Sequence, residues 1–182
     1  MVPAGTYSFG PSEGRLVLRV YREGLASSMG HDLVLEATRW SAEATVDGDD
    51  PTRSSLTATA DVQSLEVREA KGGAKPLSDK DRADIKKNIE KVLSTRRYSE
   101  IVFRSTAVRP PAGNRLTVAG ELTIKDATRP AELELTVEDG RATASTTVVQ
   151  SQWGIKPFSA LMGALKVRDA VEIEVEVSVP KD

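Results

Sequence analysis

Hydrophobic and polar residues alternate along most of the chain. In the clearest run, valine or isoleucine occupies every odd position from 171 to 179, and glutamate or serine occupies every even position. The same period of two recurs at residues 15–21, 56–62, 116–124 and 132–137. Because neighbouring residues of a strand point to opposite faces, this alternation predicts antiparallel strands with one buried and one solvated face.

The alternating runs are separated by turn-forming residues. Asp139-Gly140 lies between two runs and predicts a two-residue hairpin, because such turns need the positive φ that these residues tolerate. We expect eight or nine strands, at residues 6–9, 15–22, 32–46, 55–67, 101–109, 115–124, 131–138, 141–150 and 169–179. So many amphipathic strands predict an all-β fold, either a closed barrel or a two-sheet sandwich.

One segment follows a helical period instead. Within residues 78–95, Ile85 and Ile89 fall on one apolar stripe, and Ser78 is placed to cap the helix. We expect this α-helix to pack across the barrel or sheet, or to cover one open end. Apolar residues at helical spacing also predict a short helical turn near residues 158–165, which acts either as a plug or as a lid.

The composition restricts the function. The 182 residues predict a single domain over residues 1–182, and their net charge of −2 is spread along the chain. This balance gives no electrostatic reason to expect nucleic acid as a partner. The absence of cysteine excludes disulfides and thiol nucleophiles, and with one histidine in the sequence we expect no metal site.

The start of the chain has no basic segment followed by an apolar run, and no apolar stretch approaches the roughly 20 residues of a membrane-spanning helix. We therefore expect a cytoplasmic protein with no transmembrane segment. A periplasmic or secreted location stays open if an export signal has been removed. A homodimer is also compatible with the sequence.

The one histidine, His31, precedes Asp32 and raises the question of catalysis. Neighbours in a strand point to opposite faces, which works against a Ser–His–Asp triad, and the chain has no Gly-x-Ser-x-Gly segment. Three interpretations stay open. His31 and Asp32 hydrogen-bond at the entrance to a strand, where Gly30 supplies an unusual backbone angle; or His31 binds a polar head group at the mouth of a barrel; or His31 is a general base assisted by Asp32 or Glu100.

The segment AKGGAKP at residues 70–76 has two interpretations. Its glycines and lysines suit a phosphate head group, because exposed backbone N–H groups and ammonium groups attract anions. Such a loop can equally be a solvated turn. Trp40 and Trp153 are likewise either core residues or part of a ligand-binding wall.

Two segments resemble a known family. YSEIVFRST at residues 98–106 is similar to the Tyr-Pro-x-Ile-x-Phe-x-Ser segment of the YceI-like family of lipid-binding proteins. VAGELTIKDATRPAELEL at residues 118–135 resembles the family's x-Gly-x-Leu-Thr-Ile-x-Gly-x-Thr-x-Pro-x-x-Leu strand pair. Ser99 stands where proline is usual, Asp126 where glycine is usual, and Arg22 near the place of a usual histidine.

The resemblance implies an extended, eight-stranded, antiparallel, lipocalin-like barrel with an apolar tunnel. It implies a non-enzymatic carrier that has no cofactor of its own and holds a polyisoprenoid, an isoprenoid quinone, a fatty acid or a similar lipid. The alternatives are a hydrolase- or isomerase-like enzyme that uses His31 on the same barrel, and an interaction module with a filled core.

The inward faces of the strands and the apolar stretch after residue 150 predict which residues form the tunnel wall. We expect the wall to consist of Leu16, Leu18, Val20, Leu33, Leu35, Ala58, Phe103, Leu122, Leu135, Trp153, Phe158, Met162, Ile173 and Val175. His31, Tyr98 and Lys156 are the residues expected at the ligand's head group. We predict no catalytic residue.

Overall fold

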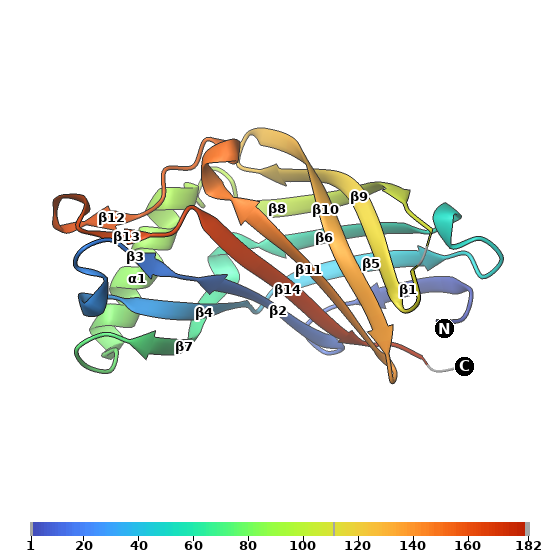
Figure 1. Ribbon diagram of the computed structural model, residues 1–182, viewed down its shortest axis with the longest axis horizontal. Helices are drawn as coiled ribbons and strands as arrows, with labels where there is room; N and C mark the ends of the chain where they lie inside the picture. Colours follow the sequence, from blue (N-terminus) through green and yellow to red (C-terminus); the bar gives the residue numbers. More distant parts are fainter. Residues whose placement is uncertain (1, 111, 181–182) are drawn as a thin grey trace.

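A computed structural model describes residues 2–110 and 112–180, in which one α-helix accompanies many antiparallel strands (Figure 1). The helix is α1 (Asp79–Leu93). The strands are β1 (Gly5–Phe9), β2 (Gly14–Val20), β3 (Arg22–Glu23), β4 (His31–Ala37), β5 (Trp40–Val46), β6 (Ser55–Asp61), β7 (Leu65–Gly72), β8 (Glu100–Val108), β9 (Arg115–Ile124), β10 (Ala127–Glu138), β11 (Arg141–Val149), β12 (Ser159–Ala160), β13 (Leu165–Val167) and β14 (Ala170–Ser178).

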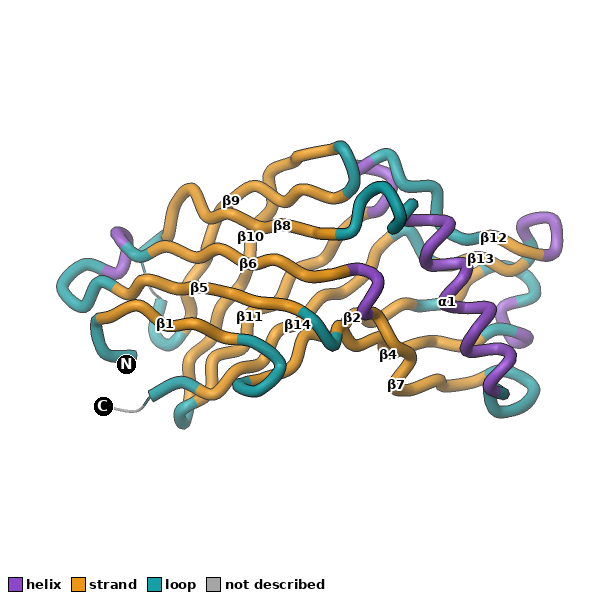
Figure 2. Tube along the Cα trace, turned by 180° about the vertical axis from the view of Figure 1, so that it is seen from behind, coloured by secondary structure: helices purple, strands orange, loops and turns teal. Residues whose placement is uncertain are grey.

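Within the described residues, eleven strands form one antiparallel sheet in the order β1-β5-β6-β8-β9-β10-β11-β14-β2-β4-β7. The sheet is strongly curled into a half-barrel, and α1 lies across one end of it (Figures 1 and 2). A second sheet, β12-β13-β3, lies at the same end. The mainly β fold with one inserted helix is confirmed. The predicted count of eight strands is wrong.

The additional strands arise because two predicted long strands are each divided. The predicted strand 32–46 becomes β4 and β5, which are separated by residues 38–39, and the predicted strand 55–67 becomes β6 and β7, which flank the 3₁₀ turn Val62–Ser64. β5 pairs with β1 and β6, whereas β4 pairs with β2 and β7. Each half therefore belongs to a different part of the curled sheet.

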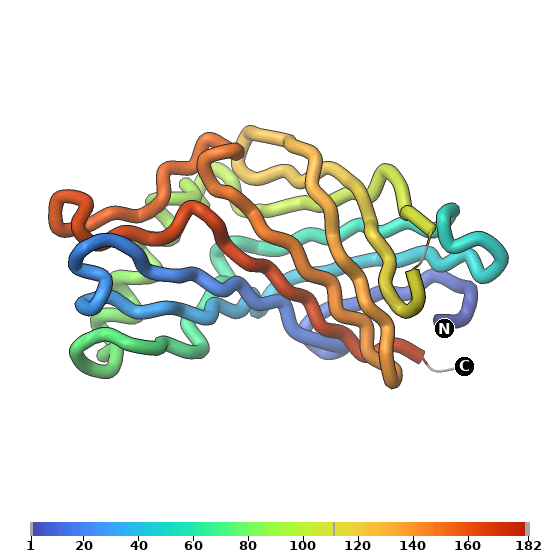
Figure 3. Tube along the Cα trace, viewed as in Figure 1, coloured from blue at the N-terminus to red at the C-terminus, as the bar shows by residue number. Residues whose placement is uncertain are grey.

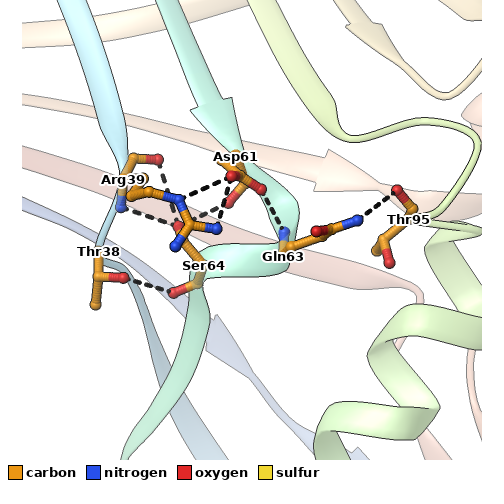
Figure 4. A network of polar contacts seen from close by, with 6 residues as sticks. All are labelled: Thr38, Arg39, Asp61, Gln63, Ser64 and Thr95. Carbon is orange, nitrogen blue, oxygen red and sulfur yellow. Dashed lines mark hydrogen bonds and ion pairs between the residues drawn. The ribbon is translucent and has the colours of Figure 1, made fainter.

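The two breaks face each other, and Ser64 joins them (Figure 4). The Ser64 hydroxyl accepts a hydrogen bond from the Arg39 amide at 3.0 Å and donates to the Asp61 carbonyl at 2.7 Å. The amide and the hydroxyl of Thr38 both donate to the Ser64 carbonyl at 3.2 Å. Because buried backbone groups need partners, these bonds replace the ladder bonds that each break removes.

The helix begins where the sequence predicted. Ser78 and Asp81 form a capping box, in which the Ser78 hydroxyl accepts from the Asp81 amide and the Asp81 carboxylate accepts from the Ser78 amide. Just beyond its other end, the Thr95 carbonyl accepts a hydrogen bond from Gln63 Nε2 at 3.1 Å (Figure 4). This bond ties the end of α1 to the break between β6 and β7.

The predicted turns differ in outcome. Asp139-Gly140 forms the hairpin between β10 and β11, with φ of 50° and 79°, as predicted. The helical turn expected near residues 158–165 is reduced to a 3₁₀ turn at Leu161–Gly163 between the paired strands β12 and β13. Left-handed backbone at Leu161 and Met162 reverses the chain before a helix can form.

The buried side chains form two clusters. One surrounds Leu16, Leu35 and Trp40, and the other surrounds Phe103 and Trp153. The first cluster includes Val62 and Leu65 at the break between β6 and β7, and α1 adds Ile89 and Leu93 to its edge. α1 also adds Val92 and Leu93 to the second cluster, so the helix packs against both.

We predict that Ser64→Ala lowers the free energy of unfolding by about 1–3 kcal/mol, because the Arg39 amide loses its buried acceptor. The Ser64 residue is 2 % exposed, so water cannot take the place of the hydroxyl. Urea unfolding measures the change. The exposed Ser12→Ala is the control and should shift the free energy by less than about 0.5 kcal/mol. Equal effects of the two substitutions would contradict the role given to Ser64.

Arg39 and Asp61 form an ion pair at the breaks, with 2.8 Å between the guanidinium and the carboxylate (Figure 4). This pair should make the free energy of unfolding depend on pH. Burial acts to raise the pKa of Asp61, but hydrogen bonds from Arg39 and from the Gln63 amide outweigh it and hold this pKa below its ordinary value. A carboxyl with a lowered folded-state pKa stabilises the fold above its unfolded pKa of about 3.9, and this contribution is lost as the pH falls through the folded-state pKa.

We therefore predict that Asp61→Asn destabilises the protein at about pH 7 and that the difference from the native chain shrinks toward about pH 3. Urea unfolding of both proteins across this range measures the difference. A difference that stays constant with pH would mean that the charge of Asp61 contributes nothing.

Candidate functional site

A cavity of about 390 Å³ separates α1 from the inner face of the curled sheet. From α1 come Ile85, Ile89 and Val92, which include the two isoleucines of the predicted apolar stripe. The strands opposite present aliphatic side chains: Leu18, Val20, Leu33, Leu35, Ile101, Ile124, Val148, Val171 and Ile173. A chamber of this volume with apolar walls suits a hydrocarbon ligand.

The cavity has a buried inner wall and an exposed rim. On the inner wall, Ile124, Val148 and Ile155 are only 3–4 % exposed. At the rim, Met29 is 62 % exposed and Asp81 is also open to solvent. The rim lies at the end of the molecule where the turn after β3 and the β12–β13 turn come together (Figure 1). We call this rim the mouth.

Strand register sets where the cavity ends. Ile173 pairs with Leu18, and both line the cavity. One row further along the same strands, Val175 pairs with Leu16, and both pack in the first core cluster. Ala37 pairs with Leu16 and is 1 % exposed, so it completes this second row. We call Ala37, Leu16 and Val175 the floor row.

His31 lies at the mouth. Its Nε2 is 2.9 Å from the carbonyl oxygen of Lys75, and since a carbonyl can only accept, Nε2 carries the proton in this contact. The imidazole also lies against Gly73, where a Cβ atom would be 2.3 Å from Nε2. A side chain at position 73 would therefore displace the ring.

Arg22 lies beside His31. Its guanidinium donates to the Gly30 carbonyl and is 3.8 Å from the Asp32 carboxylate, which also accepts from the Arg22 amide at 2.9 Å. A Cβ atom on Gly72 would lie 2.2 Å from the guanidinium. Gly72 and its neighbour Gly73 thus let two side chains lie close to bare backbone.

Gly30 has an ordinary extended backbone with φ of −98°, so the unusual angle expected there is wrong. Its lack of a side chain instead leaves room for Leu165, since a Cβ atom would be 2.7 Å from Cδ1 of that residue. Glycine at position 30 is required by close packing at the mouth.

The mouth carries charges of both signs. The hydrogen bonds from the Ser78 hydroxyl and amide lower the pKa of Asp81 below its ordinary value, and the nearby charges of Lys75 and His31 act in the same direction. Asp84 and Lys166 add one charge of each sign to the cavity lining. The combination is a polar rim around an apolar chamber.

The comparisons with known proteins agree with this architecture. The model of the YceI-like domain matches residues 20–179. The chain belongs to the YceI-like family. A search of curated proteins found no match.

Two solved structures show the same fold as this YceI-like chain. The crystal structure of Burkholderia cenocepacia BcnA has a TM-score of 0.70 at 16 % sequence identity and covers 93 % of this chain and 98 % of its own. The Campylobacter jejuni YceI protein has a TM-score of 0.58 at 11 % identity and covers 81 % of this chain and 85 % of its own. At these identities the likeness concerns the fold alone.

Eight of the fourteen residues predicted to form the tunnel wall fall into two groups around the cavity. Those that line it are Leu18, Val20, Leu33, Leu35, Phe158 and Ile173. Leu16 and Val175 lie in the floor row instead, because the cavity ends one row earlier. Whether any of these residues contacts a ligand stays a prediction.

The remaining predicted wall residues lie away from the cavity. Ala58, Phe103 and Leu122 pack in the second core cluster, and Leu135 lies opposite Leu116 and Ala144. These strands continue past the floor row, so their inward residues meet one another. Met162 is fully exposed because its left-handed backbone projects it from the β12–β13 turn.

The aromatic and polar residues that were predicted for the site also lie in different places. Trp153 donates from Nε1 to the Leu122 carbonyl at 3.0 Å within the core, and Trp40 is 7 % exposed in the other cluster, so both are core residues. Of the three expected head-group residues, His31 lies at the mouth. Tyr98 donates to the Asp126 carboxylate, and Lys156 is an exposed residue outside the cavity lining.

Sequence reasoning missed the polar part of the lining. Asp81, Asp84 and Asn88 come from the same face of α1 as Ile85, and their spacing of three and four residues was available in the sequence. Arg22, which stands near the place of a usual family histidine, also lines the cavity.

Among the described residues, no helix of this structure is long and apolar enough to span a membrane.

We predict that Gly73→Ala moves the His31 ring and destabilises the protein more than Gly154→Ala. Both glycines have left-handed backbone, with φ of 74° and 68°, so alanine costs about 1–2 kcal/mol of strain at each. Only position 73 adds a clash with the imidazole, because nothing lies within 4 Å of a Cβ atom on Gly154.

Because His31 is the sole histidine, its imidazole NMR signals report the displacement without ambiguity. Unfolding in urea gives the difference in stability between the two variants. Unchanged imidazole signals in Gly73→Ala, together with equal stability losses, would contradict the contact.

Proposed function

We propose that this protein is a non-enzymatic carrier that holds a long-chain amphiphile in the cavity beneath α1. The observation that carries the proposal is the combination of an apolar chamber of about 390 Å³ with a polar mouth. The ligand's hydrocarbon chain would lie between α1 and β2, β4 and β14. Its head group would remain at the mouth, beside His31 and Arg22.

The energetics favour a hydrocarbon chain. Burial contributes about 0.8 kcal/mol per methylene, so a few isoprene units or a comparable acyl chain offset the cost of immobilising a flexible molecule. Polyisoprenoids, isoprenoid quinones and fatty acids all fit this requirement. Membership of the YceI-like family supports a barrel that binds such lipids. Contacts at the mouth would then orient the ligand more than they determine its affinity.

Two features of the site support binding over the alternatives. An open chamber of this volume favours a carrier over an interaction module with a filled core. The Asp32 carboxylate, which was expected to assist His31 as a general base, instead accepts from the Arg22 amide and lies 3.8 Å from the Arg22 guanidinium. The His31 imidazole hydrogen-bonds to the Lys75 carbonyl, so the pairing of His31 with Asp32 that an assisted base needs is not formed.

Two buried valines provide a matched test. Val148 on β11 and Val118 on β9 are both 4 % exposed and belong to the same core cluster, but only Val148 lines the cavity. We predict that Val148→Phe fills empty space, leaves the free energy of unfolding nearly unchanged and weakens lipid binding at least about tenfold. Val118→Phe should cost about 1–3 kcal/mol by overpacking and leave binding by the folded protein unchanged.

Native mass spectrometry and organic extraction identify any bound lipid, and titration with solubilised polyprenols, quinones and fatty acids measures affinity. The proposal fails if the native protein retains none of these three classes. It also fails if Val148→Phe and Val118→Phe lose the same stability and neither affects binding.

A further inference from the structure

Four large hydrophobic residues are exposed at the mouth end of the molecule. Leu25 is 101 % exposed and Met29 62 %, and both lie in the turn that follows β3. Leu161 is 53 % exposed and Met162 107 %, and both lie in the β12–β13 turn. Among the described residues, these are the large hydrophobic side chains left exposed. We call them the apolar tips.

The two turns are held side by side. β3 pairs with β13, and the Ala26 amide donates to the Ala164 carbonyl at 2.8 Å. Gly24 packs so closely against this turn that a Cβ atom would lie 2.4 Å from the Ala164 carbonyl oxygen. Figure 3 shows both turns projecting at the same end of the long axis, the first in blue and the second in orange-red. The apolar tips are therefore presented together by a braced support.

The backbone holds the second pair of tips in solvent at a conformational cost. Leu161 and Met162 have φ of 50° and 55°, in the left-handed region that residues with large side chains rarely adopt. A polar residue such as asparagine would tolerate this backbone better and would be soluble there. Two large apolar residues at strained, exposed positions indicate that these side chains have a partner.

The apolar tips are continuous with the cavity. Met29 is one of the tips and also lines the mouth, and Leu165, two residues beyond the second turn, lines it as well. A surface against which the tips bury would thus seal the mouth from water. A lipid could then pass between that surface and the cavity without crossing the solvent.

The area of the tips fits a lipid surface better than a second protein. A leucine or methionine side chain buries roughly 60–120 Å², so four of them offer at most about 500 Å², whereas a stable protein interface takes about 800 Å² from each partner. The turns also project as two narrow points rather than as a flat face (Figures 2 and 3). Such points can insert between lipid head groups.

Charge does not explain the attraction. Lys71 and Lys75 lie near the mouth, but Lys71 is 3.8 Å from Glu69, and Asp81 and Asp84 belong to the same rim. With both signs present, attraction to an anionic membrane would be weak and screened by salt. The apolar side chains must supply most of the binding.

We propose that the apolar tips dock this protein on the surface of a lipid bilayer and align the mouth with it. This inference rests on the proposed carrier function and adds where the cargo is loaded and released. The docking is hydrophobic and superficial, with four side chains entering the interfacial layer while the half-barrel stays outside.

Vesicle flotation tests the docking directly. The native protein should float with phosphatidylcholine vesicles, equally in the presence of about 0.5 M salt. The double variant Leu161→Asn, Met162→Asn should bind on the order of tenfold more weakly while remaining folded, because asparagine suits left-handed backbone. The control is Asp139→Asn, which places the same residue at φ of 50° in the hairpin at the opposite end and should bind as the native protein does (Figure 1).

The insertion can also be observed at one position. A tryptophan at the tip, in Met162→Trp, should be quenched by brominated lipid, whereas Trp40 and Trp153 are buried in the core and should not be. Docking is overturned if the native protein does not float, if high salt abolishes flotation, or if the asparagine double variant floats unchanged. A change of oligomeric state in that variant would instead assign the tips to a second copy of the chain.

Loading from two lipid sources separates this inference from the carrier function. When lipid is supplied in detergent micelles, the double variant and the native protein should retain the same amount. When it is supplied in vesicles, the double variant should load on the order of tenfold more slowly. Equal rates from vesicles overturn docking alone, whereas a failure of both proteins to retain lipid from either source overturns the carrier function itself.

Discussion

The hydrogen bonds at Ser64 hold together the two breaks on which the rest of the fold depends. They lie where β4 ends before β5 and where β6 ends before β7, and beyond these breaks each half pairs in a different part of the sheet. Ser64 can hold both breaks because it is buried and uses its hydroxyl and its carbonyl at once. A buried serine that hydrogen-bonds to several backbone groups contributes more to stability than a small side chain usually does, because each of those groups would otherwise be buried without a partner.

The divergence of the sheet creates the site. Past the breaks, β7 no longer follows β6, and β8 pairs with β6 alone on that side. α1 crosses the end of the half-barrel that this leaves. Its apolar face lies over the cavity, and Ile89, Val92 and Leu93 also pack against the edges of the two core clusters. Gln63, at the break between β6 and β7, donates a hydrogen bond to the Thr95 carbonyl just beyond α1. The position of α1 over the cavity is therefore tied to the position of this break.

The sequence predicted the parts of the fold that depend on local pattern. Alternation gave the strands, Asp139-Gly140 gave its hairpin, and Ser78 gave the start of the helix. It did not predict the division of residues 32–46, although the apolar positions change there from odd numbers (33, 35 and 37) to even numbers (40, 42, 44 and 46) across the polar pair Thr38-Arg39. A strand break there depends on hydrogen bonds to Ser64, which is 25 residues away from Arg39 in sequence.

The site was predicted less completely for a similar reason. All inward residues of an amphipathic strand show the same alternation in the sequence. Leu18 and Leu16 are therefore alike in sequence, although Leu18 pairs with Ile173 in the row that lines the cavity and Leu16 pairs with Val175 in the row packed in the core. The tips illustrate the opposite case. Apolar residues at helical spacing predicted a buried helical turn, but the left-handed backbone of Leu161 and Met162 turned the same side chains outward.

The floor row gives the cavity a fixed depth. Consecutive inward residues on one strand are about 6.6–6.8 Å apart, so moving the floor by one row changes the available length by that step and by no smaller one. Smaller side chains at Leu16 and Val175 would extend the chamber toward Trp40, whereas larger ones at Leu18 and Ile173 would shorten it. The spacing of the strand rows therefore sets the depth of the cavity in discrete increments, and a few residues far from the mouth determine it.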